Sequence, residues 1–161
     1  MTGADFPRYE KVYLASPFFN PEQLLLVKTI EVLIKNIGLE CYSPRLDGVL
    51  QDMSPEERAR STKRIFEKNC AEIMKCDAMF AILNDRDTGT IWELGFGYAY
   101  KQFRNLDYRI ITFTSGENKE NVMLKECVNA HAHGLEQAEA FLLLLKSGEQ
   151  LLPINDIRDT F

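Results

Sequence analysis

Several residue types and motifs are scarce in this sequence, and each absence argues against a class of function. Among its 161 residues are two histidines and four cysteines, and no cysteine pair has the CxxC spacing of a zinc or redox site. The formal net charge of -5 argues against binding a nucleic acid polymer. No apolar run is long enough to span a membrane. We therefore expect no metal, no other cofactor, and neither a membrane nor a nucleic acid partner.

The motifs of two large nucleotide-binding classes are also missing. A dinucleotide-binding fold carries G-x-G-x-x-G after its first strand, whereas this chain has Ala15-Ser16-Pro17-Phe18-Phe19 at that place. The chain also lacks a P-loop lysine motif. Dehydrogenases and NTPases have folds that give a similar pattern of elements, so these absences argue against both classes.

The cysteines and the N-terminal stretch bear on location. Thiols scattered along a chain are typical of reduced cysteines in an intracellular protein, and we expect most of them to be buried. They are Cys41, Cys70, Cys76 and Cys127. The stretch 1–5 lacks the basic and apolar regions of a secretory signal peptide. The sequence thus predicts a cytoplasmic protein.

The residues that are present predict one α/β domain over 1–161. The chain is 45% hydrophobic and 27% charged, as globular domains are, and apolar or β-branched runs alternate with amphipathic segments. Capping residues such as Asn20 and Ser54 mark helix starts. The expected strands are 11–16, 39–43, 76–83, 108–114 and a short one at 128–133. The expected helices are 20–38, 54–75, 90–103 and 135–146, with another starting near Asn121.

This alternation with short connections predicts a doubly wound parallel sheet of about five strands, flavodoxin- or Rossmann-like. Ligands of such sheets bind beyond the carboxyl ends of the strands, where the strand order reverses. We therefore expect the site to be formed by the segments after Ser16, Leu83 and Thr114.

The segment after the third expected strand carries the most chemistry. Glu93 would lie one turn into a helix that starts at the ligand edge, where the helix dipole keeps a carboxylate ionised. Gly95 and Gly97 weaken that helix and suit one packed closely against another backbone. A purely structural interpretation also fits: Thr90 caps the helix, and Glu93 completes a capping box.

Several elements, in this order and spacing, resemble the nucleoside 2-deoxyribosyltransferase family. The resemblance spans nearly the whole chain, and no single element is specific alone. The elements are Tyr13, Phe18-Phe19, Asp77 at the head of the apolar strand, Asp87 and Gly89 before the helix, Glu93-Leu94-Gly95-x-x-Tyr98-Ala99, and Asn121-Val122-Met123. The resemblance implies transfer of a 2-deoxyribosyl group between nucleobases, as in nucleoside salvage.

Catalytic roles follow from the resemblance. Glu93 matches the nucleophile that forms a deoxyribosyl-enzyme intermediate, and Tyr13 matches the tyrosine that orients it. Asp77 and Asp87 match acids near the base, one of which would protonate the leaving nitrogen. The chemistry is sound, because a carboxylate nucleophile splits the reaction into two easier steps and a second carboxyl group serves as acid and then base.

The sequence does not choose between the two acids. The acid needs a raised pKa, which the apolar strand could give to Asp77 and the charge of Glu93 could give to Asp87. Each assignment also has a structural alternative. Asp77 could be a turn former at the start of its strand, and Tyr13, between two apolar residues, could be a core side chain.

Substrate contacts are expected from further residues. In the family pattern a neighbouring subunit inserts Asn121 and Met123, with Asn121 holding sugar hydroxyls, which implies a homo-oligomer (a dimer or larger) with shared sites. The structural alternatives are a helix cap for Asn121 and core packing for Met123. We expect one of Phe18 and Phe19 to pack under the sheet and the other to stack on the base.

The loop residues Asp47 and Gly89 are also expected near the substrate. A 5′-phosphate would need a serine- and arginine-rich cradle, but Pro17 and two phenylalanines follow Ser16, which favours a nucleoside without phosphate. Hydrolysis of a deoxynucleoside or its monophosphate, and a non-catalytic nucleotide-sensing module, remain alternatives. The preference for purine or pyrimidine bases stays open, as does the role of 156–161, which could fold over the site or trail in solvent.

Overall fold

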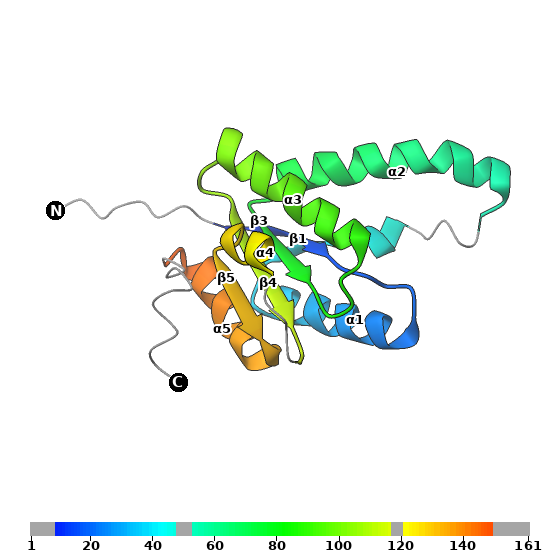
Figure 1. Ribbon diagram of the computed structural model, residues 1–161. Coiled ribbons are helices and arrows are strands. Elements are labelled where there is room, and N and C mark those ends of the chain that lie inside the picture. Colours follow the sequence, from blue (N-terminus) through cyan, green and yellow to red (C-terminus); the bar gives the residue numbers. More distant parts are fainter. Residues whose placement is uncertain (1–8, 48–52, 117–120, 150–161) are drawn as a thin grey trace.

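A parallel β-sheet with helices on both faces forms the centre of the structure (Figure 1). The computed structural model describes residues 9–47, 53–116 and 121–149. Its strands are β1 (Lys11–Ala15), β2 (Glu40–Tyr42), β3 (Ala78–Ile82), β4 (Arg109–Thr114) and β5 (Ala130–His133). Its helices are α1 (Pro21–Asn36), the 3-10 helix η1 (Pro44–Asp47), α2 (Pro55–Lys75), α3 (Thr88–Phe103), α4 (Val122–Glu126) and α5 (Gly134–Ser147). The predicted fold class is confirmed.

The strand order across the sheet is β2-β1-β3-β4-β5, with all neighbours parallel. The chain adds β2 on one side of β1 and then β3 on the other, so the order reverses at β1 and β3. This is the flavodoxin-like order, in which the ligand crevice opens at the carboxyl ends of these two strands. The topology therefore places the candidate site between the segments that follow β1 and β3.

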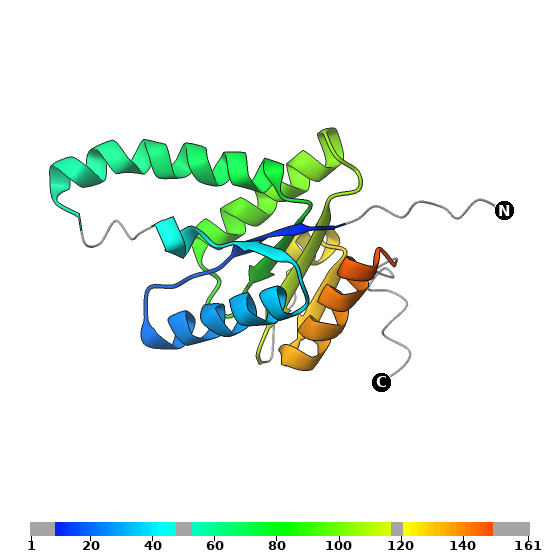
Figure 2. The same ribbon diagram turned by 180° about the vertical axis from the view of Figure 1, so that it is seen from behind.

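Alternating side chains build a separate core on each face of the sheet. Val12 and Leu14 belong to the core beneath α1 and α5, whereas Tyr13 and Ala15 belong to the core beneath α2 and α3. Figures 1 and 2 show this division of the helices between the two faces. Every residue of β3 is buried, because the strand is covered from both sides.

The predicted helix starts are confirmed by their caps. The side chain of Asn20 accepts a hydrogen bond from the backbone N–H of Gln23 at the start of α1. Ser54 and Glu57 form both hydrogen bonds of a capping box at the start of α2. Gly38, with φ of +85°, follows the end of α1, in a conformation that L side chains rarely adopt.

Gly95 and Gly97, two of the three glycines of α3, have different surroundings. A Cβ at Gly97 would lie 2.9 Å from Cε of Met79, so this turn of the helix touches the sheet. A Cβ at Gly95 would have no neighbour within 4 Å. Of these two glycines, only Gly97 allows the expected close packing of the helix, and its neighbour is the side chain of Met79 rather than another backbone.

Two further expectations concern the whole chain. All four cysteines are free thiols, but only Cys76 is fully buried and the others are partly exposed, so the expectation that most are buried is wrong. In the part of the chain that the structure describes, no helix is both long enough and apolar enough to cross a membrane.

Candidate active site

Glu93 and Tyr13 meet on the face of the sheet that α2 and α3 cover. The hydroxyl group of Tyr13, a fully buried residue of β1, donates a 2.7 Å hydrogen bond to Oε1 of Glu93 in α3. Tyr13 is thus a core residue whose side-chain hydroxyl group points at a carboxylate. The family resemblance predicts that Tyr13 orients Glu93, and the fold brings the two side chains into contact.

The capping-box interpretation of Glu93 is wrong. Helix α3 begins at Thr88, and its N-cap is Asp87, whose side chain accepts a hydrogen bond from the backbone N–H of Thr90. Thr90 therefore lies inside the helix and does not cap it. Among the described residues, the polar contact of the Glu93 carboxylate is the hydrogen bond from Tyr13.

The surroundings of Glu93 change its acidity. Burial raises the pKa of Glu93 from 4.5 to about 7, the hydrogen bond from Tyr13 lowers it, and the negative charge of Asp87 raises it. The helix dipole was expected to keep this carboxylate ionised, but with a pKa of about 7 Glu93 is only partly ionised at neutral pH. Burial and the charge of Glu93 also raise the pKa of Tyr13 far above its usual value, so Tyr13 stays protonated as the donor.

Asp87 is held in place by the first turn of α3. Its Oδ2 atom accepts hydrogen bonds from the backbone N–H of Thr90 at 2.8 Å and from the hydroxyl of Thr90 at 3.0 Å. A Cβ at Gly89 would lie 3.0 Å from this same oxygen, so a side chain there would crowd the cap. Gly89 thus contributes to the site by leaving room for the carboxyl group of Asp87.

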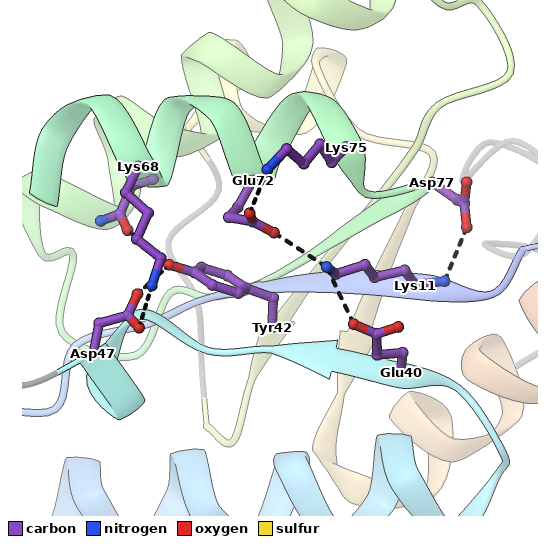
Figure 3. A network of polar contacts seen from close by, with 9 residues as sticks. Lys11, Glu40, Tyr42, Asp47, Lys68, Glu72, Lys75 and Asp77 are labelled. Atoms are coloured by element: carbon purple, nitrogen blue, oxygen red, sulfur yellow. Dashed lines mark hydrogen bonds and ion pairs between the residues drawn. The ribbon is translucent and has the colours of Figure 1, made fainter. Parts of the chain in front are cut away.

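Asp77 does not belong to this site. It precedes β3, at the amino edge of the sheet, and Oδ2 of its side chain accepts backbone N–H bonds from Glu10 at 2.8 Å and Lys11 at 2.9 Å. Figure 3 shows the carboxyl group turned toward the backbone of Lys11. Chemistry in a doubly wound sheet lies at the opposite, carboxyl edge. Asp77 is therefore a strand-start residue, as its structural alternative predicted, and its candidacy as the general acid is wrong.

The two phenylalanines after β1 have different environments, as expected. Phe18 packs against the core beneath α1, whereas 54% of Phe19 is exposed. Their ring centroids lie 5.0 Å apart. The packing of Phe18 is confirmed, and stacking of Phe19 on a base stays a prediction.

Asp47 ends η1 and forms a polar cluster with Tyr42 and Lys68, which the sequence did not predict. Tyr42 donates a short hydrogen bond to its Oδ2, and Nζ of Lys68 lies 2.5 Å from its Oδ1. Burial would raise the pKa of Asp47, but the hydrogen bonds from Lys68 and Tyr42 hold it below the usual value. The signal for Tyr42 is the register of β2, which places it beside Tyr13, and no local pattern encodes that register.

The structure places Asn121 and Met123 at the start of α4. Asn121 is its N-cap and accepts hydrogen bonds from the backbone N–H groups of Met123 at 2.9 Å and Leu124 at 3.4 Å. The cap interpretation of Asn121 is confirmed. Met123 is 75% exposed, so its interpretation as a core residue is wrong. Insertion into a neighbouring subunit stays a prediction for both residues.

Other expectations concern metals and the C-terminus. Within the described ranges, no three His, Cys, Asp or Glu side chains are grouped as a metal ion would require. The stretch 156–161 lies outside the described residues, as does the loop from residue 48 to 52 that follows Asp47.

With this geometry in view, the comparison with known families is decisive. The nucleoside 2-deoxyribosyltransferase family model matches residues 12–129, a range that begins in β1 and contains both Tyr13 and Glu93. The chain belongs to the nucleoside 2-deoxyribosyltransferase family. Membership indicates an enzyme that acts on nucleosides.

The solved structure of a 2-deoxyribosyltransferase agrees with this assignment. The 2-deoxyribosyltransferase of Bacillus psychrosaccharolyticus is 31% identical, covers 82% of this chain and 95% of its own, and superposes with a TM-score of 0.67. A conserved protein of Enterococcus faecalis (TM-score 0.54; 85% of this chain and 87% of that one) and a CMP N-glycosidase of Clostridium botulinum (0.55; 86% and 99%) are each 17% identical and show the fold alone. No curated protein matches the sequence.

Proposed function

We propose that this protein transfers the 2-deoxyribosyl group of a 2′-deoxynucleoside to an acceptor nucleobase through a covalent intermediate on Glu93. The observation that carries the proposal is the 2.7 Å hydrogen bond between Tyr13 and Glu93, at the place where the family pattern has its nucleophile. A partly buried carboxylate with a single oriented donor suits attack on a sugar carbon better than a solvated surface glutamate does.

In the first step, Glu93 attacks the anomeric carbon while the bond to the base nitrogen breaks. The base leaves with the bonding electron pair and takes a proton from a general acid. Asp87 is the remaining candidate, since Asp77 lies at the other edge of the sheet. Both hydrogen bonds described for the side chain of Asp87 use Oδ2, so a proton on Oδ1 is compatible with its role as a cap.

In the second step, the acceptor base gives its proton to Asp87 and attacks the same carbon, and Glu93 leaves as a carboxylate. The acid and the base are then one residue used in opposite directions. Tyr13 binds Oε1 of Glu93 throughout, which assigns the attack to Oε2. The hydrogen bond also stabilises the carboxylate that departs in this step.

Substrate contacts complete the proposal. Phe19 is exposed beside the carboxyl end of β1 and stacks on the base, and Asp47 lies near the base edge. Asn121 and Met123 serve the site of a neighbouring copy, so the protein is a homo-oligomer with shared sites. Sedimentation equilibrium tests the last point, because a monomer at working concentration would contradict it.

Base exchange tests the reaction. The purified protein is incubated with 2′-deoxyinosine, with and without free adenine, and the products are separated by liquid chromatography. Deoxyadenosine formed only when adenine is present supports transfer. Equal release of hypoxanthine in both tubes makes the protein a hydrolase, and no change with purine, pyrimidine or phosphorylated substrates contradicts an enzymatic role.

A further inference from the structure

Tyr42 lies directly against the tyrosine that contacts the proposed nucleophile. In the parallel pairing of β1 and β2, Tyr13 and Tyr42 are partners, and their rings stack with centroids 5.5 Å apart and an interplanar angle of 28°. The two rings therefore share one face of the sheet. The ring of Tyr42 is therefore one of the surfaces against which the Tyr13 ring packs.

Tyr42 is itself held by polar groups from two helices. Its hydroxyl group donates to Oδ2 of Asp47 in η1, and Asp47 is paired with Lys68 of α2 at 2.5 Å. The ammonium groups of Lys11 and Lys68 lie 5.9 Å and 5.8 Å from the centroid of the Tyr42 ring, within the range of a cation–π contact. Figure 3 shows the ring with Lys11 on one side and the Asp47–Lys68 pair at its hydroxyl end.

The position of Lys11 is fixed in turn by carboxylates. Its Nζ lies 3.1 Å from Glu40 of β2 and 3.1 Å from Glu72 of α2. Glu72 also accepts a hydrogen bond from Lys75. Tyr42 is thus held by a polar network that joins β1, β2, η1 and α2. Within the described part of the chain, no member of this network forms a hydrogen bond or ion pair with Glu93.

We infer that Tyr42 is a positioning residue of the active site: it fixes the ring of Tyr13 and, through the Tyr13 hydroxyl, the carboxylate of Glu93. This inference rests on the proposed role of Glu93 as the nucleophile. Tyr42 makes no contact with the reacting atoms in this scheme. Its effect passes through the stacking contact and then through the 2.7 Å hydrogen bond.

The ionisation of Glu93 provides a readout of this coupling. Among the described residues, the titratable groups that act on Glu93 are Tyr13 from β1 and Asp87 from the start of α3, and the charge of Glu93 in turn acts on Cys70 of α2. Of these, Tyr13 is the one that lowers the pKa of Glu93. A Tyr13 ring that tilts away weakens this effect, so the pKa of Glu93 must rise.

Three variants separate positioning from general destabilisation. Tyr42→Leu removes the stacked ring, and Tyr42→Phe keeps the ring but removes the hydrogen bonds of its hydroxyl group to Asp47 and to Oδ1 of Asn69. Tyr100→Leu is the matched control, because it removes another partly buried tyrosine, one that meets Tyr108 edge-on at 5.4 Å and has no ring contact with Tyr13. None of the three changes the formal charge of the protein at neutral pH.

The test is an NMR titration of the ¹³C-labelled glutamate carboxyl groups, with the Glu93 signal assigned by its loss in Glu93→Gln. We expect Tyr42→Leu to raise the pKa of Glu93 by about one unit and to lower kcat about tenfold with little change in KM. Tyr42→Phe shifts the pKa in the same direction by less, and it serves alone if the leucine variant does not fold. Tyr100→Leu leaves the pKa unchanged.

A Glu93 pKa that stays at the wild-type value in both Tyr42 variants would overturn the inference, as would an equal shift in the Tyr100 control. The titration needs no turnover. A wild-type protein that exchanges no base would therefore contradict the proposed function, while a shift in the Tyr42 variants alone would still establish the coupling.

Discussion

The hydroxyl group of Tyr13 lies 2.7 Å from Oε1 of Glu93, although 80 residues separate the two in the chain. The contact exists because β1 lies beside β3 in the sheet and α3 packs back over both strands. It joins a buried donor to a carboxylate whose pKa is about 7. The effects of these two residues on the pH dependence of the reaction and on the stability of the fold can be measured separately.

Replacing Tyr13 by phenylalanine should move the pH dependence of the reaction. The substitution removes the one interaction that lowers the pKa of Glu93, so burial and Asp87 then raise it further above 7. Because Glu93 acts as a carboxylate, the acidic limb of the kcat/KM profile shifts to higher pH. At neutral pH we expect a loss of about ten- to a hundredfold. A profile of reduced height but unchanged pH position would contradict this role of Tyr13.

The same pKa predicts a pH-dependent effect of Glu93→Gln on stability. A pKa raised from 4.5 to about 7 favours folding while Glu93 is protonated, and this contribution is lost as pH rises through 7. The variant does not titrate at this position. It should match the wild type below about pH 4.5 and exceed it above pH 7, by on the order of 2 to 3 kcal/mol. Urea unfolding at pH 4 and pH 8 measures this, and equal differences at both values would contradict it.

Asp87 can be tested with its cap preserved. Asparagine is as good an N-cap as aspartate, so Asp87→Asn should keep α3 intact while removing a negative charge that raises the pKa of Glu93. We expect a lower Glu93 pKa together with slower release of the base, because the proton donor is gone. Asp87→Ala should also lose about 1 kcal/mol of unfolding free energy through the lost cap. Full activity of Asp87→Asn would remove Asp87 from the proton transfer.

Gly95 and Gly97 of α3 allow a paired test of how closely this helix packs against the sheet. Gly97→Ala places a methyl group 2.9 Å from Cε and 3.3 Å from Sδ of Met79, which is fully buried. We expect a net loss of about 1 to 2 kcal/mol from overpacking, even after the gain in helix propensity. Gly95→Ala has free space and should gain about 0.5 to 1 kcal/mol. Urea midpoints compare the two, and a Gly97→Ala variant as stable as Gly95→Ala would contradict this and show that the Met79 side chain or α3 shifts to make room.

The fold was predictable because its signals are local. Strand and helix alternate with clear caps at Asn20 and Ser54, and right-handed crossovers with short connections leave few topologies for such a pattern. The boundaries of α3 were less predictable. Asp87 and Thr90 are both good caps, and the sequence alone does not show which of them the chain uses.

The site was predictable only in part, for a different reason. The family pattern identified Tyr13 and Glu93, but order along the chain placed Asp77 with them, and only the three-dimensional structure shows that it lies at the amino edge of the sheet. Tyr42 was missed because its relation to Tyr13 depends on the pairing of β1 with β2. The raised pKa of Glu93 depends on burial, which a helix-dipole argument does not include.

The most direct test of the account is to look for the covalent intermediate. The protein is mixed with 2′-deoxyinosine without an acceptor base, quenched in acid within the first turnovers, digested and examined by mass spectrometry. Glu93→Gln, which keeps a similar shape but lacks the nucleophile, is the control, and circular dichroism verifies its fold.

We expect the wild-type peptide containing Glu93 to gain the mass of one deoxyribosyl group, which added adenine discharges as deoxyadenosine. Glu93→Gln should gain nothing and exchange bases at least about a thousandfold more slowly. A deoxyribosyl group on another residue, or undiminished base exchange by Glu93→Gln, would contradict the account.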